Sequence, residues 1–302
     1  MTNMKFRKIV AVDETLLNNN AIERLQTLGE KVEVYHDFPT EESEVISRIG
    51  DADCLLVSFR TQIRSTVLDA CPNIRYIGMC CTLYNPESCN VDVIEARRRG
   101  ITVTGVKDYG DEGVVEYVIS ELVRLLHGFG PHRWEKESTE LTGRKVGIIG
   151  LGKTGSMISE ALKIFGADIR YYSRTRKPDA EMKGIKYQPL DLLLSEAEII
   201  CTCLPRNNYL LGEHEFKIMG NGKILVNTSV GPTFDKEALK QWLDKCPSSY
   251  YLCDATGMGN LAEELAHIPN VLYTPYISGK SIQSIERLSQ KALANMEDFM
   301  KN

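Results

Sequence analysis

Three glycines in the middle of the chain have the spacing that could bind a dinucleotide. They form a G-x-G-x-x-G pattern between the apolar run Lys145–Ile149 and a helical pattern. The first glycine would allow a tight turn, the second would let a pyrophosphate approach the backbone, and the third would let the helix pack closely on the strand. The free N–H groups and the positive end of the helix dipole would then face the phosphates. This order predicts a dinucleotide site, and the alternative is a plain turn between a strand and a helix. The candidate cofactor-binding residues here are Gly150, Gly152, Lys153, Thr154 and Gly155.

The residues after the next expected strand, Asp168–Tyr172, indicate which dinucleotide would be bound. NAD-binding units usually carry an acidic residue there, about 20 residues past the glycines, and it binds the ribose hydroxyls. Here the position holds Ser173, and Arg174 and Arg176 follow. A carboxylate would repel a 2′-phosphate, whereas a hydroxyl and guanidinium groups would bind it. We therefore expect NADP(H) to be favoured over NAD(H), and the alternative is a solvated basic loop.

The bulk properties limit the class of protein. The 302 residues are too many for one simple core, so two domains are expected. The net charge of −5 gives no electrostatic case for binding nucleic acid or an anionic membrane. No apolar run approaches a membrane span, and the first segment is typical of a strand rather than a signal peptide. The nine cysteines include no C-x-x-C pair, so we expect reduced thiols, a cytoplasmic protein and no metal site.

Strand and helix patterns alternate along most of the chain. The first hundred residues predict strands at 8–12, 32–35, 54–58, 74–78 and 101–103, with helices at 16–28, 41–49, 65–70 and 91–99. A helix at 111–128 and a charged linker lead to strands at 145–149, 168–172, 199–203, 223–227, 250–253 and 271–274, and an amphipathic helix from about 281 ends the chain. Such alternation, with continuously apolar strands, predicts an α/β protein with two doubly wound parallel sheets.

Several motifs carry a resemblance to a known family. They are Glu140–Gly152, Cys203–Pro205, Ile224–Thr228, Asp235–Leu239 and Pro269–Pro275. On these motifs the chain resembles the D-isomer-specific 2-hydroxyacid dehydrogenases, especially their NADP-using glyoxylate/hydroxypyruvate reductase branch, over nearly its whole length. The resemblance implies an NADP-dependent oxidoreductase acting on CH–OH donors, which transfers hydride to a small carbonyl or 2-oxo compound.

The same resemblance implies a domain organisation and further site residues. It implies a discontinuous, flavodoxin-like substrate domain (1–108 and 282–302), a central Rossmann domain (109–281), a cleft between the two and a homodimer. Asp254 matches a family position near the nicotinamide ribose. Pro205 and Thr228 follow expected strands at the sheet edge where such folds bind ligands, so both are cofactor candidates.

All three catalytic positions of the family are changed in this chain. Where the family carries an Arg that binds the substrate, this chain has Val230. Where the family carries a Glu, this chain has no carboxylate in 255–260. Where the family carries a His that moves the proton, this chain has Tyr276. A tyrosine can donate a proton, but a nearby cation must lower its ordinary pKa of about 10. Lys280 lies four residues on, in an expected loop, and the alternative is a tyrosine that packs into the cleft without chemistry.

A further departure lies in the first hundred residues. The family's glycine-rich loop, whose N–H groups hold the substrate carboxylate, is replaced by the longer segment Cys80–Asn90, which includes the acidic Glu87. Arg60 is a candidate substrate ligand, and the alternative is a surface arginine. Two functions stay open: a reductase, or a catalytically silent NADP(H)-binding sensor or partner protein.

Overall fold

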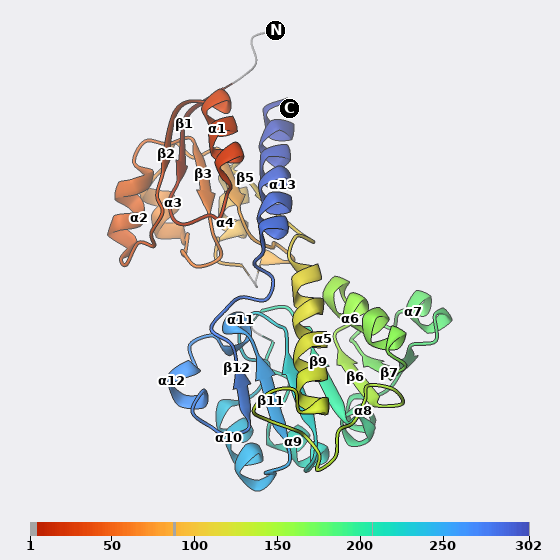
Figure 1. Cartoon of the computed structure of the whole chain (residues 1–302). Helices are drawn as coiled ribbons and strands as arrows, with labels where there is room; N and C mark the ends of the chain where they lie inside the picture. Colours follow the sequence, from red (N-terminus) through yellow and green to blue (C-terminus); the bar gives the residue numbers. More distant parts are fainter. Residues whose placement is uncertain (1–4, 87–88, 207, 302) are drawn as a thin grey trace. The chain divides into compact units, whose positions relative to one another are not determined.

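The chain folds into two compact α/β units, seen in a computed structural model that describes residues 5–86, 89–206 and 208–301. One unit combines residues 1–109 with 281–302, and the other comprises residues 110–280. The units contain a five-stranded and a seven-stranded sheet, and every strand pair in the described part of the chain is parallel (Figure 1). The predicted α/β class with two doubly wound sheets is confirmed.

The sheet of the first unit has the strand order β2-β1-β3-β4-β5. Its strands are β1 (Phe6–Ala11), β2 (Gly29–Val34), β3 (Cys54–Val57), β4 (Tyr76–Met79) and β5 (Thr102–Gly105). Its helices are α1 (Asn19–Leu28), α2 (Glu42–Ile49), α3 (Ser65–Ala70), α4 (Val93–Arg98) and α13 (Ile282–Lys301). Buried apolar side chains of α2, α3 and α4 share one core cluster with the sheet, and those of α1 and α13 share the other. The last helix of the chain therefore completes the core of the first unit, where it lies beside α1 (Figure 1).

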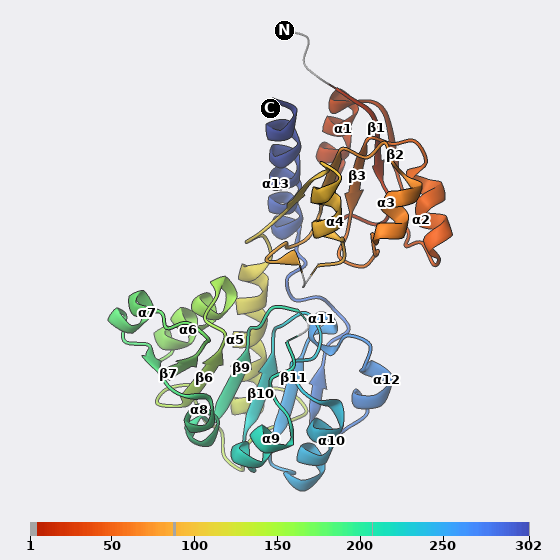
Figure 2. The ribbon, with the colours of Figure 1, turned by 180° about the vertical axis from the view of Figure 1, so that it is seen from behind.

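The sheet of the second unit has the strand order β12-β11-β10-β9-β6-β7-β8. Its strands are β6 (Lys145–Ile149), β7 (Asp168–Tyr172), β8 (Lys186–Tyr187), β9 (Ile199–Thr202), β10 (Ile224–Asn227), β11 (Tyr250–Cys253) and β12 (Val271–Tyr273). Its helices are α5 (Asp111–His127), α6 (Lys153–Ile164), α7 (Pro178–Met182), α8 (Leu190–Glu196), α9 (Glu213–Met219), α10 (Lys236–Lys245), α11 (Ala255–Met258) and α12 (Ala262–Leu265). Apolar residues of α5 and α6 pack in one core cluster, and those of α8, α9 and α10 pack in another (Figure 2).

The strand order of the second unit reverses at the pair β6 and β9. Strands β7 and β8 follow β6 on one side of it in the sheet. Strands β9, β10, β11 and β12 then lie on the other side of β6. In open parallel sheets, ligands bind beyond the carboxyl ends of the strands at such a reversal. The segments that follow these two strands begin at Gly150 and Cys203, so they flank the expected binding position.

Two of the differences from the sequence-based expectations have a simple local cause. The first helix begins at Asn19 rather than at residue 16, because the Asn18 side chain accepts a hydrogen bond from the Ala21 N–H at 2.9 Å and caps it. Leu16 also has a φ of 61°, which is outside the helical region. The short strand β8 was not expected, since two residues are too few to give an alternating pattern.

Candidate functional site

Each glycine of the loop after β6 has the geometry that its expected task requires. Gly150 has a φ of +94°, and a Cβ there would lie 2.5 Å from the Cys203 carbonyl oxygen. A Cβ on Gly155 would lie 2.2 Å from the Gly150 carbonyl oxygen, so only glycine lets α6 approach this turn. Gly152 differs, because no atom lies within 4 Å of its Cβ position. The space over Gly152 is thus open at the reversal of the sheet.

The start of α6 presents backbone donors rather than side-chain caps. Gly152 is its N-cap residue, and no side chain in the described part of the chain caps the helix. The Thr154 hydroxyl donates to the carboxylate of Asp111, the first residue of α5. The hydroxyl is therefore occupied, and Thr154 can offer its backbone N–H. Lys153 is exposed beside it. This helix start can accept an anion.

The loop after β7 carries the three residues expected to choose between the cofactors. The Ser173 hydroxyl donates to the Thr175 carbonyl oxygen within the loop. Arg174 is exposed and makes no ion pair with any residue that the structure describes. Arg176, in contrast, binds the carboxylate of Glu181 on α7 through both Nε and Nη2. The Arg176 guanidinium and the Tyr171 hydroxyl lower the pKa of Glu181, so this carboxylate stays ionised.

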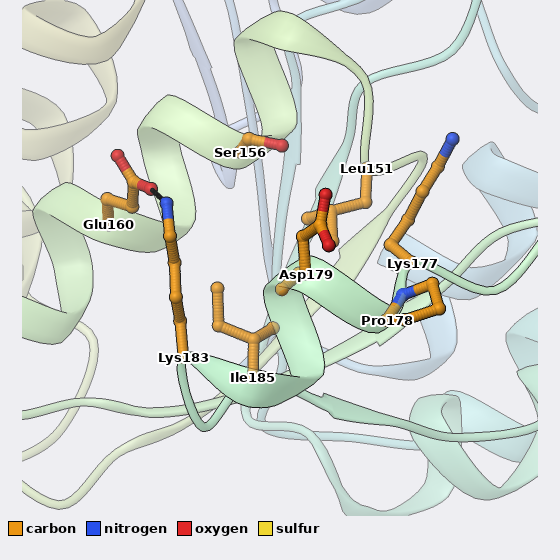
Figure 3. A pocket seen from close by; sticks show the side chains of 9 residues that line it. Leu151, Ser156, Glu160, Lys177, Pro178, Asp179, Lys183 and Ile185 are labelled. Carbon is orange, nitrogen blue, oxygen red and sulfur yellow. Dashed lines mark hydrogen bonds and ion pairs between the residues drawn. The ribbon is translucent and has the colours of Figure 1, made fainter.

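A hollow of about 270 Å³ lies beside the glycine loop, between α6 and α7 (Figure 3). Leu151, from the glycine loop, and Ser156, from the first turns of α6, line one part of it. Lys177 lines it at one side, and the ion pair between Glu160 and Lys183, with 2.7 Å between Oε1 and Nζ, lies at the other (Figure 3). The hollow therefore adjoins both the glycine loop and the basic loop.

The ends of β9 and β10 are joined by hydrogen bonds that fix the sheet edge. The Thr228 hydroxyl donates to the Thr202 carbonyl oxygen at 2.9 Å and to Cys203 Sγ at 3.3 Å. Burial raises the pKa of the Cys203 thiol to about 12, so it stays protonated near neutral pH. Pro205 is half-buried in the segment after β9. The buried Asn227 donates to the carbonyl oxygens of Gly231, after β10, and Gly257, in α11, and it was not predicted from the sequence as a positioning residue.

Asp254 is almost fully buried, with 4% of its surface exposed, and its carboxylate is engaged within the protein. Oδ1 accepts from the Gly257 N–H at 2.7 Å, which caps α11. Oδ2 accepts from both the N–H and the hydroxyl of Ser278, at 2.8 and 2.6 Å. Asp254 thus holds the segment after β12 in place. Its contact with a nicotinamide ribose stays a prediction.

Tyr276 and Lys280 lie in the irregular segment after β12, as the sequence led us to expect. Tyr276 is 79% exposed, and its hydroxyl makes no hydrogen bond with any described residue. Lys280 is exposed, and the structure records no ion pair between it and the described side chains. Val230, on the loop after β10, is 40% exposed. The structure records no contact between the two proposed partners, Tyr276 and Lys280.

Arg60 follows β3 in the first unit. Its guanidinium carbon lies 4.8 Å from the centre of the Phe38 ring and 5.5 Å from that of Phe59. Its backbone N–H donates to the hydroxyl of Ser58 at 3.2 Å. The buried Asp13 in turn accepts from the N–H and the hydroxyl of Ser58, at 2.8 and 2.7 Å. Asp13 was not predicted from the sequence as a positioning residue, although its place directly after an apolar strand could have indicated it.

The segment Cys80–Asn90 is fixed by a hydrogen bond at its C-terminal end. The Asn90 amide donates to the Ser58 carbonyl oxygen at 2.8 Å, which ties this segment to the turn after β3. Glu87, the acidic residue expected to distinguish the segment, lies outside the described residues.

Two features are absent from the described residues. None of their helices is long and apolar enough to cross a membrane. Nor do the same residues include a group of three or more His, Cys, Asp or Glu side chains placed to hold a metal ion.

Comparison with known proteins gives a family match and full-length relatives. The model of the D-isomer specific 2-hydroxyacid dehydrogenase NAD-binding domain matches residues 121–278. A hydroxypyruvate reductase of Blautia hydrogenotrophica is 30% identical, with 97% of each chain covered. A glyoxylate reductase of Thermococcus gammatolerans is 29% identical, with 93% of this chain and 89% of the relative covered.

Solved structures share the fold at lower identity. An acyclic imino acid reductase in complex with NADPH and D-arginine has a TM-score of 0.83 and 22% identity, with 97% of each chain covered. The NAD⁺-bound 3-phosphoglycerate dehydrogenase of Entamoeba histolytica has a TM-score of 0.80 and 22% identity, with 99% of this chain and 96% of that one covered.

Proposed function

This chain belongs to the D-isomer specific 2-hydroxyacid dehydrogenase family, and on that premise we propose that it is an NADP-dependent oxidoreductase that reduces a small carbonyl or 2-oxo compound. The relatives named hydroxypyruvate reductase and glyoxylate reductase favour this enzyme over the silent sensor. The observation that carries the proposal is the open backbone over Gly152, at the uncapped start of α6 and the reversal of the sheet.

The cofactor would be held by residues of the second unit. The N–H groups of the segment Gly150–Gly155, Lys153 and Thr154 among them, would bind the pyrophosphate, since they lie at the positive end of α6. When bound, the reduced nicotinamide supplies the hydride. Pro205, Thr228 and Asp254 would line the nicotinamide side, Asp254 chiefly by fixing the neighbouring backbone.

The preference for NADP(H) is part of this proposal. It is supported by the absence of a carboxylate at position 173 and by the Arg174 guanidinium, which forms no ion pair with the described residues and can make charge-assisted bonds to a 2′-phosphate. Arg176 is the second candidate, although Glu181 already pairs with it.

The reduction also needs a proton donor. Tyr276 is proposed for this role, because its hydroxyl is exposed and free of internal hydrogen bonds in the described structure. Lys280 is the cation proposed to assist this donor, which would require its ammonium to move within about 4–6 Å of the hydroxyl. Arg60 is the proposed ligand for an anionic group of the substrate. This role is supported by its exposed guanidinium, which lies over the ring of Phe38.

The assembly and the location of the protein complete the proposal. We infer a homodimer from the family resemblance, with residues 1–108 and 282–302 as substrate domain and residues 109–281 as nucleotide domain. A cytoplasmic location is supported by the nine cysteines, all of which are free thiols.

The test combines cofactor titration with turnover. Binding of NADPH and of NADH is measured by intrinsic fluorescence, and NADPH oxidation is then followed at a panel of small 2-oxo acids, aldehydes and ketones. The expected result is tighter binding of NADPH, by about tenfold or more, and NADPH-dependent reduction of at least one carbonyl compound. Tight NADPH binding with no turnover on the whole panel would instead support the silent sensor.

A further inference from the structure

The basic loop after β7 is tied to α7 by one carboxylate. Glu181 accepts hydrogen bonds from Arg176 through both of its oxygens, with 3.0 Å between Arg176 Nε and Glu181 Oε1. The Tyr171 hydroxyl also donates to Oε1, at 2.7 Å. The same hydroxyl accepts from the Lys177 N–H at 2.7 Å. Since Tyr171 is fully buried in β7, these bonds fix the end of the loop to the core of the unit.

This network gives the two arginines of the loop different electrostatic surroundings. Arg176 lies over the ring of Tyr187, with 5.0 Å between the guanidinium carbon and the ring centre, and its positive charge is offset by Glu181. Arg174 has no such counter-charge among the described residues. A carboxylate that holds a guanidinium in a bidentate pair competes with a phosphate for the same donors. The Arg174 guanidinium can therefore interact with an incoming phosphate at its full charge, whereas the charge of Arg176 is offset by Glu181.

We propose that Glu181 is a specificity-determining residue that limits the preference for NADP(H) by holding Arg176, so that Arg174 is the main ligand of the 2′-phosphate. The inference rests on the proposed NADP(H) site and goes beyond it, because it assigns a role to a residue outside the proposed cofactor ligands. The 2′-phosphate is the only difference between the two cofactors. The ratio of their dissociation constants therefore isolates the effect of Glu181 from general damage to the fold, which would weaken both.

The decisive variant is Glu181→Gln. Glutamine keeps the shape and an oxygen that can accept from the Tyr171 hydroxyl, but it removes the charge that neutralises Arg176. We expect the ratio of the dissociation constants, NADH over NADPH, to rise about three- to tenfold, the range for a partly exposed charge-assisted contact. An unchanged or lowered ratio would overturn the inference, because Glu181 would then be neutral or helpful toward the phosphate.

Glu160→Gln is the matched control. Glu160 lies at the same hollow and also forms an ion pair, but with Lys183 rather than with an arginine of the loop. Its neutral variant should leave the ratio of the dissociation constants within about twofold of the wild type, since salt screens exposed charges that lie more than a Debye length of about 10 Å apart. An equal rise in both variants would overturn the inference, because the lost negative charge alone would then explain it.

Arginine variants supply a second measurement that does not depend on how Glu181→Gln folds. Arg174→Met should lower the ratio tenfold or more in the wild-type background, whereas Arg176→Met should lower it less than about threefold. In the Glu181→Gln background, Arg176→Met should remove the gain. Equal losses for the two arginines in the wild type would contradict the inference. A wild type without any preference would reject the proposed NADP(H) selectivity, whereas the role of Glu181 is judged by the change between variant and wild type.

Discussion

Asp254 and Ser278 are joined by two hydrogen bonds to one carboxylate oxygen, from the Ser278 N–H at 2.8 Å and its hydroxyl at 2.6 Å. The neighbouring Ala255 N–H donates to the Tyr276 carbonyl oxygen at 3.1 Å. A Cβ on Gly113 would lie 2.4 Å from the Ser278 carbonyl oxygen, so the same segment also packs closely on α5. The backbone that carries Tyr276 is thus fixed from two directions, while the Tyr276 ring stays exposed.

Ser278→Ala should loosen this segment without unfolding the second unit. Loss of a hydrogen bond to a buried carboxylate costs about 1.5–3 kcal/mol, which corresponds to about tenfold or more in local opening. Hydrogen exchange of residues 276–280 should therefore speed up by that factor, and Asp254→Asn should have a similar effect. Ser195→Ala is the control, because the Ser195 hydroxyl is exposed and donates only to the Leu192 carbonyl oxygen within its own helix. Unchanged exchange in Ser278→Ala would mean that the packing on α5 alone holds the segment.

Ser173→Asp should reverse the cofactor preference. A carboxylate at this position would repel the 2′-phosphate of NADPH and could accept hydrogen bonds from the ribose hydroxyls of NADH. Fluorescence titration should show NADPH binding weakened by about tenfold or more and NADH binding unchanged or improved. Ser173→Ala separates the two effects, since it removes only the hydroxyl, which bonds Thr175 within the loop. A variant that still prefers NADPH would place the phosphate elsewhere.

The local features of the nucleotide unit were predictable, because their causes lie within a few consecutive residues. The spacing of Gly150, Gly152 and Gly155 reflects the turn itself, and the structure gives each glycine the expected geometry. The engagement of Asp254 by Ser278 was not predictable, since it joins residues 24 positions apart whose encounter depends on the order of β11 and β12. The Arg176–Glu181 pair was missed for a different reason: α7 is too short to give a periodic signal.

Val230→Arg should improve the use of ordinary 2-keto acids. We predict that glyoxylate, pyruvate and hydroxypyruvate are poor substrates of the wild type, because valine cannot bind a carboxylate. Val230 is 40% exposed, so an arginine can replace it without being buried. The expected result is a rise of about tenfold or more in kcat/KM for glyoxylate with NADPH, and Val230→Met controls for side-chain size. Wild-type turnover of these acids at rates typical of the family would contradict the prediction and the alignment on which it depends.

Tyr276→Phe tests the proposed proton donor directly. The hydroxyl makes no hydrogen bond with any described residue and the side chain is 79% exposed, so its removal should leave the melting temperature unchanged. NADPH affinity should also hold, because the phosphates are expected at Gly150–Gly155, far along the sheet order from β12. If the hydroxyl donates the proton, single-turnover oxidation of NADPH should slow by about a hundredfold or more, the usual scale for a general acid. Lys280→Met should lower the rate less, since the structure records no contact between the described Lys280 and Tyr276 side chains. Equal rates for wild type and Tyr276→Phe would remove Tyr276 from the mechanism and leave water or a group on the substrate as the source of the proton.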